Sequence, residues 1–122
     1  MDNNSSVFVL NEKNFTREVL NSRGLVLVQF NAVWSGDCRI VASTINKLSA
    51  EFEGSFKLGI VDVDRNQWLA RKYRIQTLPT ILFFHNGIVV DQILGVFSAK
   101  KMTDKLLMLL ESQDEEPDTA GR

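Results

Sequence analysis

Two near-continuous apolar runs, residues 24–30 (GLVLVQF) and residues 56–64 (FKLGIVDVD), constrain the fold of this chain more than any other feature. Their content of Val, Leu and Ile is typical of strands that are covered on both faces. Between them lies a stripe of apolar residues with the spacing of one helix face: Val41, Ile45, Leu48 and Phe52. Gly54 follows as a natural helix end. The segment therefore predicts a right-handed crossover between two parallel strands.

Two more elements are predicted before this unit. Residues 7–10 form a short β-prone run, and Asn11 can cap a helix over residues 12–20. The apolar residues of this helix share one side, which we expect to be buried: Phe15, Val19 and Leu20.

The second half of the chain predicts a short helix, a hairpin and a last helix. The short helix covers residues 66–73, with Trp68 and Tyr73 packing it. Within residues 77–95, two β-prone runs flank Asn86-Gly87, the dipeptide that tight hairpin turns prefer. Ser98 can cap a helix over residues 99–111. The residues expected to point inward from this helix are Met102, Leu106, Leu109 and Leu110.

The resulting order is βαβαβαββα, an α/β fold with a central mixed β-sheet flanked by helices. A chain of 122 residues suits one domain, which we place at residues 1–111. Residues 112–122 contain four acidic residues, one Arg and Pro117 but no large apolar side chain. We expect this acidic tail to be disordered and to serve solubility.

The net charge and the cysteine count indicate which partners and which compartment suit this chain. The formal net charge is −1, which does not indicate nucleic acid or an acidic membrane surface as a partner. We expect no secretory signal in the polar first residues and no transmembrane segment. Cys38 is the only cysteine, so no internal disulfide can form. This suits a reducing, cytoplasmic location.

The loop that carries Ser35 and Cys38 follows the first buried strand. Open α/β sheets usually place their functional sites at the carboxyl ends of such strands. The sequence therefore predicts the site of this protein in the segment AVWSGDCRIV, residues 32–41.

Four segments carry a resemblance to the thioredoxin family: residues 27–38 (LVQFNAVWSGDC), 61–66 (VDVDRN), 73–87 (YRIQTLPTILFFHNG), and Gly95 with FSAKK at 97–101. The resemblance spans residues 7–111, and the order of elements agrees. It implies a thioredoxin fold, in which a redox loop begins a long helix and a cis-proline faces that loop.

The family's reactive motif is Trp-Cys-Gly-Pro-Cys, and this chain departs from it. Trp34, Gly36 and Cys38 match the motif, whereas Ser35 replaces the first cysteine and Asp37 replaces the proline. In the family the first cysteine attacks a substrate disulfide as a thiolate, and the second resolves the mixed disulfide. The resemblance thus implies that Cys38 is the resolving thiol and that the attacking thiol is absent.

Physical chemistry explains why Ser35 cannot replace the missing thiol. A helix N-terminus stabilises negative charge and promotes thiolate formation, but a hydroxyl is too weak an acid to ionise there. The hydroxyl would need a neighbouring base. The only histidine, His85, adjoins the hairpin turn, where we expect solvent. Ser35 is therefore interpreted as a helix cap or polar filler.

Cys38 is expected to be shielded, and the adjacent Asp37 adds negative charge that disfavours a thiolate. We interpret it as an inert small hydrophobe. Mixed disulfides with a small thiol, or a Cys38–Cys38 dimer, stay open as alternatives. Gln29 stands where the family usually carries a buried Asp that moves the resolver's proton, and Ile60 stands where it carries a Lys. An amide cannot act as a general base at neutral pH.

The resemblance also implies a surface that binds peptides. Residues 77–80 (TLPT) match the family's cis-proline loop, so Leu78–Pro79 is expected to be cis. In the family this loop pairs with extended peptides. The other residues predicted to surround it are Val33, Trp34, Gly36, Asp37, Thr77, Val96 and Phe97. Alternatively, Val33 and Phe97 fill a gap left by family residues, for example where Asn31 stands in place of the usual Trp.

Our leading hypothesis is an atypical thioredoxin-like protein that binds polypeptides or protein thiols near this loop, with weak or no dithiol reductase activity. The alternative is a monothiol protein-disulfide oxidoreductase that acts through Cys38. A third possibility is a homodimer formed through the same apolar rim, and we expect a monomer or a weak homodimer. We expect no cofactor and no metal. Asp62 and Asp64 could imitate a pair of metal ligands, but their pattern is more typical of a solvent-exposed strand end. The lysines of the last helix lack the aromatic platform of a nucleic-acid site.

Overall fold

The computed structural model describes residues 7–120, with the side chains of residues 7–112. Residues 1–6 and 121–122 lie outside the described residues. The predicted absence of a secretory signal concerns the first of these segments, and the end of the predicted acidic tail falls in the second. No helix of the described part is long and apolar enough to cross a membrane.

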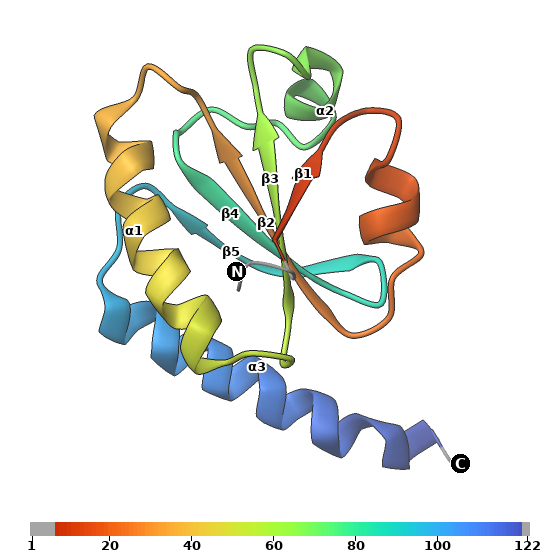
Figure 1. Cartoon of the computed structure of the whole chain (residues 1–122). Helices are drawn as coiled ribbons and strands as arrows, with labels where there is room; N and C mark the ends of the chain where they lie inside the picture. Colours follow the sequence, from red (N-terminus) through yellow and green to blue (C-terminus); the bar gives the residue numbers. More distant parts are fainter. Residues whose placement is uncertain (1–6, 121–122) are drawn as a thin grey trace.

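A five-stranded mixed sheet forms the centre of the domain (Figure 1). The strands are β1 (Val7–Leu10), β2 (Leu25–Asn31), β3 (Lys57–Asp62), β4 (Thr80–His85) and β5 (Ile88–Leu94). Their order across the sheet is β1-β3-β2-β4-β5. β3 pairs in parallel with β1 and β2, whereas β4 pairs antiparallel with β2 and β5. The predicted parallel crossover and the predicted fold class are confirmed.

Helices cover both faces of this sheet (Figure 1). They are the short π-helix η1 (Thr16–Leu20), α1 (Gly36–Glu51), α2 (Gln67–Lys72) and α3 (Ala99–Ala120). Because side chains alternate along a strand, Leu25 and Leu27 of β2 enter one core with α1 and α3. Val26, Val28 and Phe30 enter a second core that includes Phe15 just before η1, Val19 of η1 and Leu69 of α2. The central strand is thus covered on both sides, as its sequence predicts.

The first helix is shorter than predicted. Asn11 does cap a turn, because its Oδ1 accepts the N–H groups of Lys13 and Asn14 at 2.8 and 2.9 Å. The Asn14 side chain, however, accepts the N–H of Asn11 and donates to the carbonyl of Val9. Such side-chain bonds compete with helical ones, which explains why regular helix begins only after this turn.

The hairpin turn between β4 and β5 forms as predicted. Asn86 and Gly87 have φ angles of 53° and 85°, the left-handed pair that a type I′ turn requires. A Cβ at position 87 would lie 2.4 Å from the carbonyl oxygen of Leu20. Gly87 is therefore required both by the backbone angle and by this close approach.

α3 begins as predicted but extends further. The Ser98 Oγ accepts the N–H of Lys101 at 3.1 Å, while Met102 and Leu106 are buried. The helix continues to Ala120, through residues 112–120 of the predicted disordered tail. Gln113, Glu115 and Glu116 favour this extension through their helix propensity, whereas Pro117 opposes it because it lacks a backbone N–H.

The two aromatic residues predicted to pack α2 differ in their environments. Tyr73 contacts the rings of Phe15, Phe30 and Phe84, with centroids 5.7 to 6.2 Å apart. Trp68 is half exposed, and the Lys72 ammonium lies 5.2 Å from its ring centroid. Sequence alone does not distinguish the two, because only the sheet determines which side of α2 is covered.

The ion pair between Lys105 of α3 and Asp91 of β5 predicts a pH-dependent stability. Desolvation raises the pKa of Asp91, but bonds from Lys105 (2.9 Å) and the Gln92 N–H outweigh it and leave the pKa below its ordinary 3.8. A lowered carboxyl pKa stabilises the fold above the unfolded pKa, and this contribution disappears as pH falls through the folded value. Asp91→Asn should thus cost up to about 1 kcal/mol at pH 7 and progressively less in acid.

Urea unfolding of both proteins across that pH range measures the difference. Asp104→Asn, which removes the exposed partner of Lys100, is the control and should have the smaller effect at pH 7. A cost for Asp91→Asn that stays constant down to pH 2 would contradict the assignment.

Candidate functional site

Ser35 caps the helix α1, as the sequence predicts. It has extended backbone angles (φ −92°, ψ 120°), and its Oγ accepts the N–H of Cys38 at 3.2 Å. Ser35 is itself buried. The oxygen that replaces the attacking sulfur therefore holds the first turn of the helix together.

Cys38 lies in that first turn and is 3% exposed. It borders a small cavity of about 180 Å³, whose other lining residues are Asn31, Ala32, Val33, Arg39, Ala42, Ile60 and Asp62. The surviving thiol is therefore shielded by protein, as predicted, and the cavity lies next to it. Asp37, next to it in the chain, is exposed.

His85 is placed far from Ser35. Thr80, at the start of β4, pairs with Phe30 near the site, whereas His85, at the other end, pairs with Leu25. Five strand residues span roughly 17 Å. The geometry excludes a Ser35–His85 pair and with it the activation of a serine nucleophile by the only histidine.

Gln29 is fully buried on the α1-facing side of β2 and lies beside Ile60 of β3 in the sheet register. Its Nε2 donates to the Oδ1 of Asn31 at 2.8 Å, while its Oε1 has no hydrogen-bond partner among the described residues. An unpaired buried carbonyl costs roughly 1–3 kcal/mol. Positions 29 and 60 thus hold a buried amide and an apolar side chain, neither of which ionises near neutral pH.

Trp34 is the most prominent exposed side chain of the site. It is 67% exposed, and its indole N–H donates to the Oδ2 of Asp64 at 2.9 Å. Asp64 is itself positioned in the turn after β3, where the Oδ1 of Asp62 accepts its N–H at 3.0 Å. Sequence analysis missed this role of Asp64. The feature that could have indicated this role is the position of Asp64 directly after β3, at the same edge of the sheet as the loop after β2.

The cis-proline loop lies beside the segment that follows β5. The Leu78–Pro79 peptide bond is cis. The Pro79 carbonyl accepts the N–H of Gly95 at 2.8 Å, and the Thr77 carbonyl accepts the hydroxyl of Thr80 at 2.6 Å. The first bond places Gly95, which precedes Val96 in the chain, beside Pro79.

The structure divides the predicted rim into exposed and buried residues. Val33, Gly36, Asp37, Thr77 and Val96 are exposed, and Leu78 is half-buried. Two predicted members are buried. Phe97 is only 7% exposed and packs in the core with Met102, so it fills the interior. Pro79 is also buried, so its neighbours Thr77 and Leu78 form the accessible part of the loop.

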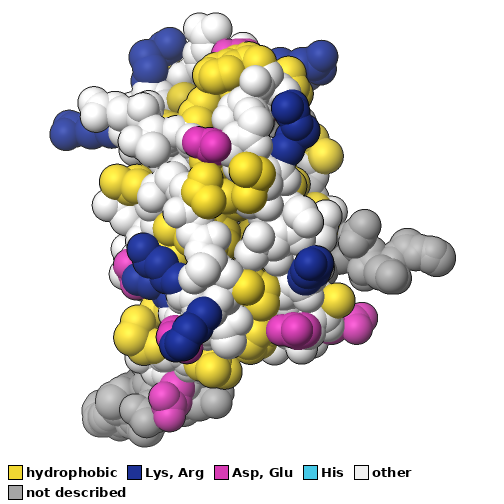
Figure 2. Space-filling view, turned by 90° about the vertical axis from the view of Figure 1, so that its left-hand side faces the viewer, with side chains coloured by type: hydrophobic (Ala, Val, Ile, Leu, Met, Phe, Trp, Pro, Cys, Tyr) yellow, Lys and Arg dark blue, Asp and Glu magenta, His cyan; other side chains and the backbone are white. Residues whose placement is uncertain are grey.

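A second cavity, of about 330 Å³, lies beside this loop. Asp64, which holds the indole, lines it together with Leu78. The remaining lining residues are Val63, Gln67, Ala70, Arg71, Ile75 and Gln76. Leu78 and the Asp64 carboxylate that binds the Trp34 indole thus lie on one hollowed surface, 14 positions apart in the chain. On the face seen in Figure 2, hydrophobic side chains reach the surface in several patches between charged ones.

Comparisons with known proteins agree with the fold. The thioredoxin family model matches residues 6–108. The thioredoxin of Griffithsia pacifica is 37% identical over 101 residues, covering 83% of this chain and 93% of that protein. Thioredoxin 2 of Chlorobaculum tepidum is 35% identical, with 81% and 91% covered. The chloroplastic M-type thioredoxin of Pisum sativum is 34% identical, with 84% and 59% covered. With this match over most of its length, the mixed sheet and a site loop at the start of α1, the chain belongs to the thioredoxin family.

Proposed function

We propose that this member of the thioredoxin family binds polypeptides, including protein thiols, at the surface formed by Trp34, Thr77, Leu78 and Val96, with weak or no dithiol reductase activity. The proposal depends most on the exposure of Trp34 and on the hydrogen bond that orients it. Its ring is two-thirds exposed while Asp64 holds its N–H in place. A large aromatic side chain fixed in this way loses little entropy on binding and is typical of an interface hot spot.

The neighbouring groups support the same proposal. Gly36 and Asp37 are exposed beside Trp34, and Val33 adds an apolar side chain that is 77% exposed. Thr77 and Leu78 precede the buried Pro79, in the loop that pairs with extended peptides in the family. A bound segment would therefore meet both apolar side chains and backbone groups on this surface.

The chemistry of the site supports binding without dithiol cycling. One cysteine cannot form the internal disulfide that such a cycle requires. The Ser35 hydroxyl accepts the Cys38 N–H, and neither Gln29 nor its neighbour Ile60 can move a proton. The site thus retains the family's binding elements without its nucleophile and its base.

The cavity beside Cys38 favours a second candidate function, a monothiol protein-disulfide oxidoreductase. The rate at which a small alkylating reagent modifies Cys38, measured against pH in the folded and the unfolded protein, separates the two functions. We expect modification in the folded protein to be at least about tenfold slower, because the thiol is buried. Equal rates would support the monothiol enzyme instead.

The cellular compartment of this protein is also a proposal. A lone cysteine suits a reducing cytoplasm. Two relatives, from Pisum sativum and Oryza sativa, are named as chloroplastic. Family membership alone therefore does not assign a compartment, and we propose the cytoplasm on the cysteine content.

Replacing Trp34 with alanine tests the binding proposal. The probe is a reduced, carboxymethylated and therefore permanently unfolded α-lactalbumin, whose affinity is measured by fluorescence anisotropy. We expect Trp34→Ala to weaken binding by about tenfold or more, the effect of truncating an aromatic hot spot. Trp68→Ala is the matched control, because Trp68 is also half exposed but lies on α2, where its backbone N–H donates to the Oε2 of Glu12.

The control should bind about as tightly as the unchanged protein. Equal losses in the two variants would show that exposed tryptophans act nonspecifically, and no loss in either would place the binding surface elsewhere. Both outcomes would contradict the proposal.

A further inference from the structure

The cavity of about 330 Å³ beside the cis-proline loop contains an arginine whose charge has no partner. Arg71 is exposed and lines this cavity, and among the described residues its guanidinium makes no hydrogen bond and no ion pair. Asp64 also lines the cavity, but its Oδ2 accepts the Trp34 indole N–H at 2.9 Å. The other lining residues are uncharged: Val63, Gln67, Ala70, Ile75, Gln76 and Leu78. Arg71 is thus the one cation among the described residues that line this cavity.

The helix α2 presents Arg71, but not the neighbouring Lys72, to the cavity. Gln67, Ala70 and Arg71 have the i, i+3, i+4 spacing of one helix face, and all three line the cavity. Lys72 points elsewhere, because its ammonium lies 5.2 Å from the ring centroid of Trp68. The helix therefore holds one of its two adjacent cations against an aromatic ring and leaves the other at the cavity.

The turn that ends α2 brings the chain from Arg71 back to the cis-proline loop. Arg74 has a left-handed backbone (φ 55°), and its N–H donates to the Arg71 carbonyl at 3.1 Å. The N–H of Ile75 donates to the Ala70 carbonyl at 2.9 Å. These two bonds form a Schellman motif, which usually brings the residue in the position of Ile75 against the one in the position of Ala70. Both residues line the cavity, so the motif explains why α2 and Leu78 share it.

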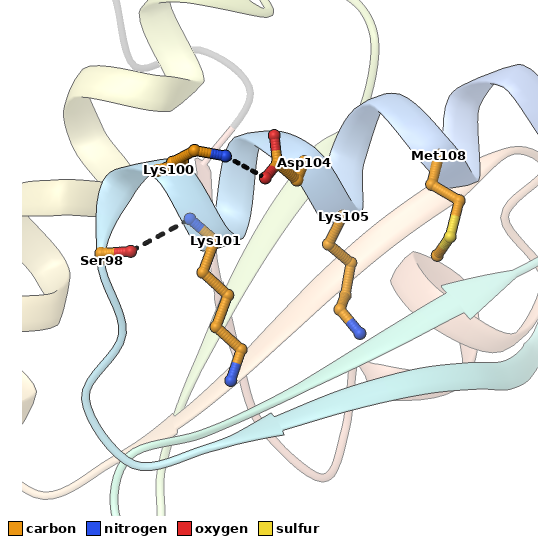
Figure 3. Close-up of a pocket in the computed structure, with 6 residues that line it drawn as sticks. All are labelled: Ser98, Lys100, Lys101, Asp104, Lys105 and Met108. Atoms are coloured by element: carbon orange, nitrogen blue, oxygen red, sulfur yellow. Dashed lines mark hydrogen bonds and ion pairs between the residues drawn. The ribbon is translucent and has the colours of Figure 1, made fainter.

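A groove of about 500 Å³ along α3 offers a comparison. Figure 3 shows Lys100 bonded to Asp104 in this groove. Lys105, which also lines it, donates to the Asp91 carboxylate at 2.9 Å. Two of the three lysines lining this groove thus have acidic partners within the protein, and none of its described lining residues belongs to the proposed binding surface. Arg71 differs on both counts, because it is unpaired and shares its cavity with Leu78 of that surface.

We propose that Arg71 determines which polypeptides bind, by pairing with the carboxylate of an aspartate or glutamate in the bound segment. The inference rests on the proposed function, because the segment must lie over Leu78 for its side chain to reach the cavity. Charge complementarity favours an acid, since residues 67–76 contain three basic side chains and no acidic one. A guanidinium can also bind a carboxylate through two parallel N–H···O bonds. The cavity, at about 330 Å³, is at the small end of ligand sites and suits a side chain.

Two forms of reduced, unfolded α-lactalbumin test this selection by fluorescence anisotropy. In one form the cysteines are carboxymethylated and carry a carboxylate, and in the other they are carbamidomethylated and carry the neutral amide of nearly the same size. We expect the unchanged protein to bind the carboxylate form about threefold more tightly or better. Arg71→Gln should remove most of this preference, by weakening the carboxylate form about three- to tenfold and the amide form less. The preference should also decline as the salt concentration rises, because the pair is partly exposed.

Arg23→Gln is the matched control, because Arg23 is exposed and lines a cavity before β2, at the end of that strand away from the site. It should leave both affinities unchanged, and circular dichroism verifies that each variant is folded. If the unchanged protein bound both forms equally while Trp34→Ala weakened both, the proposed function would stand and the role of Arg71 would be overturned. Equal losses from Arg71→Gln and Arg23→Gln would also overturn it, by showing a general charge effect. Absence of binding to either form would overturn both proposals.

Discussion

Replacing Ser35 with cysteine is expected to give the protein an insulin-reducing activity well above that of the unchanged chain. Position 35 is the N-cap of α1, where unpaired N–H groups and the helix dipole stabilise a thiolate. The Oγ of Ser35 lies 3.2 Å from the backbone nitrogen of Cys38. The new thiol would thus face the resolving position of the family, and dithiol cycling would become possible.

The activity of Ser35→Cys should remain partial, because Gln29 lies where a proton must be moved. Adding Gln29→Asp should raise the rate of insulin reduction by about 10²-fold, the lower end of what a positioned general base contributes. Initial rates with dithiothreitol, read from insulin precipitation, measure both steps. Ser35→Cys combined with Cys38→Ala is the control and should not exceed the unchanged protein.

Two results would contradict this account. If the unchanged protein reduced insulin as fast as Ser35→Cys, Cys38 alone would be a working catalyst. If Gln29→Asp added nothing, the buried amide would not limit the reaction. Because cysteine is a poorer cap than serine, the first variant should also lose about 1 kcal/mol of stability, which denaturant unfolding would report.

Phe83→Ala should cause the largest loss of stability. Phe83 is fully buried in β4, in the core that α1 and α3 form with the sheet. Removing its ring leaves a cavity in a close-packed interior, which costs about 3–5 kcal/mol. Urea unfolding measures the change. Val9→Ala, on the exposed side of β1, is the control and should change stability by less than about 0.5 kcal/mol.

A small effect of Phe83→Ala would show that the core can collapse around the missing ring. In that case the packing of α1 and α3 onto the sheet would be looser than their burial indicates. The position of Ser35 at the start of α1 depends on that packing, so the variant also tests how rigidly the site is held.

Much of the fold could be predicted because its signals are local. The cap at Ser98 and the turn at Asn86-Gly87 each depend on groups within three or four residues, and both form as predicted. The stripe of Val41, Ile45 and Leu48 needs only helical spacing to be recognised, and all three residues are buried. Ser35 as the cap of α1 belongs to the same class of prediction.

The binding surface was predicted less completely, because it depends on contacts between distant segments. Trp34 is held by Asp64, thirty positions away, and no local pattern marks that pair. Phe97 and Val96 are adjacent apolar residues, yet one is buried and the other exposed. Which of them faces the core depends on how the segment after β5 meets Pro79.

The amino-acid sequence alone determined the order of the elements, the absence of a second thiol and the loss of the family's nucleophile and base. These follow from residue identity, hydrophobic period and short-range capping, which do not depend on the rest of the molecule. Tertiary structure alone decided which rim residues are exposed and how Trp34 is oriented. The physical reason is that exposure and orientation are properties of packing, which arise only when strands far apart in the chain lie side by side.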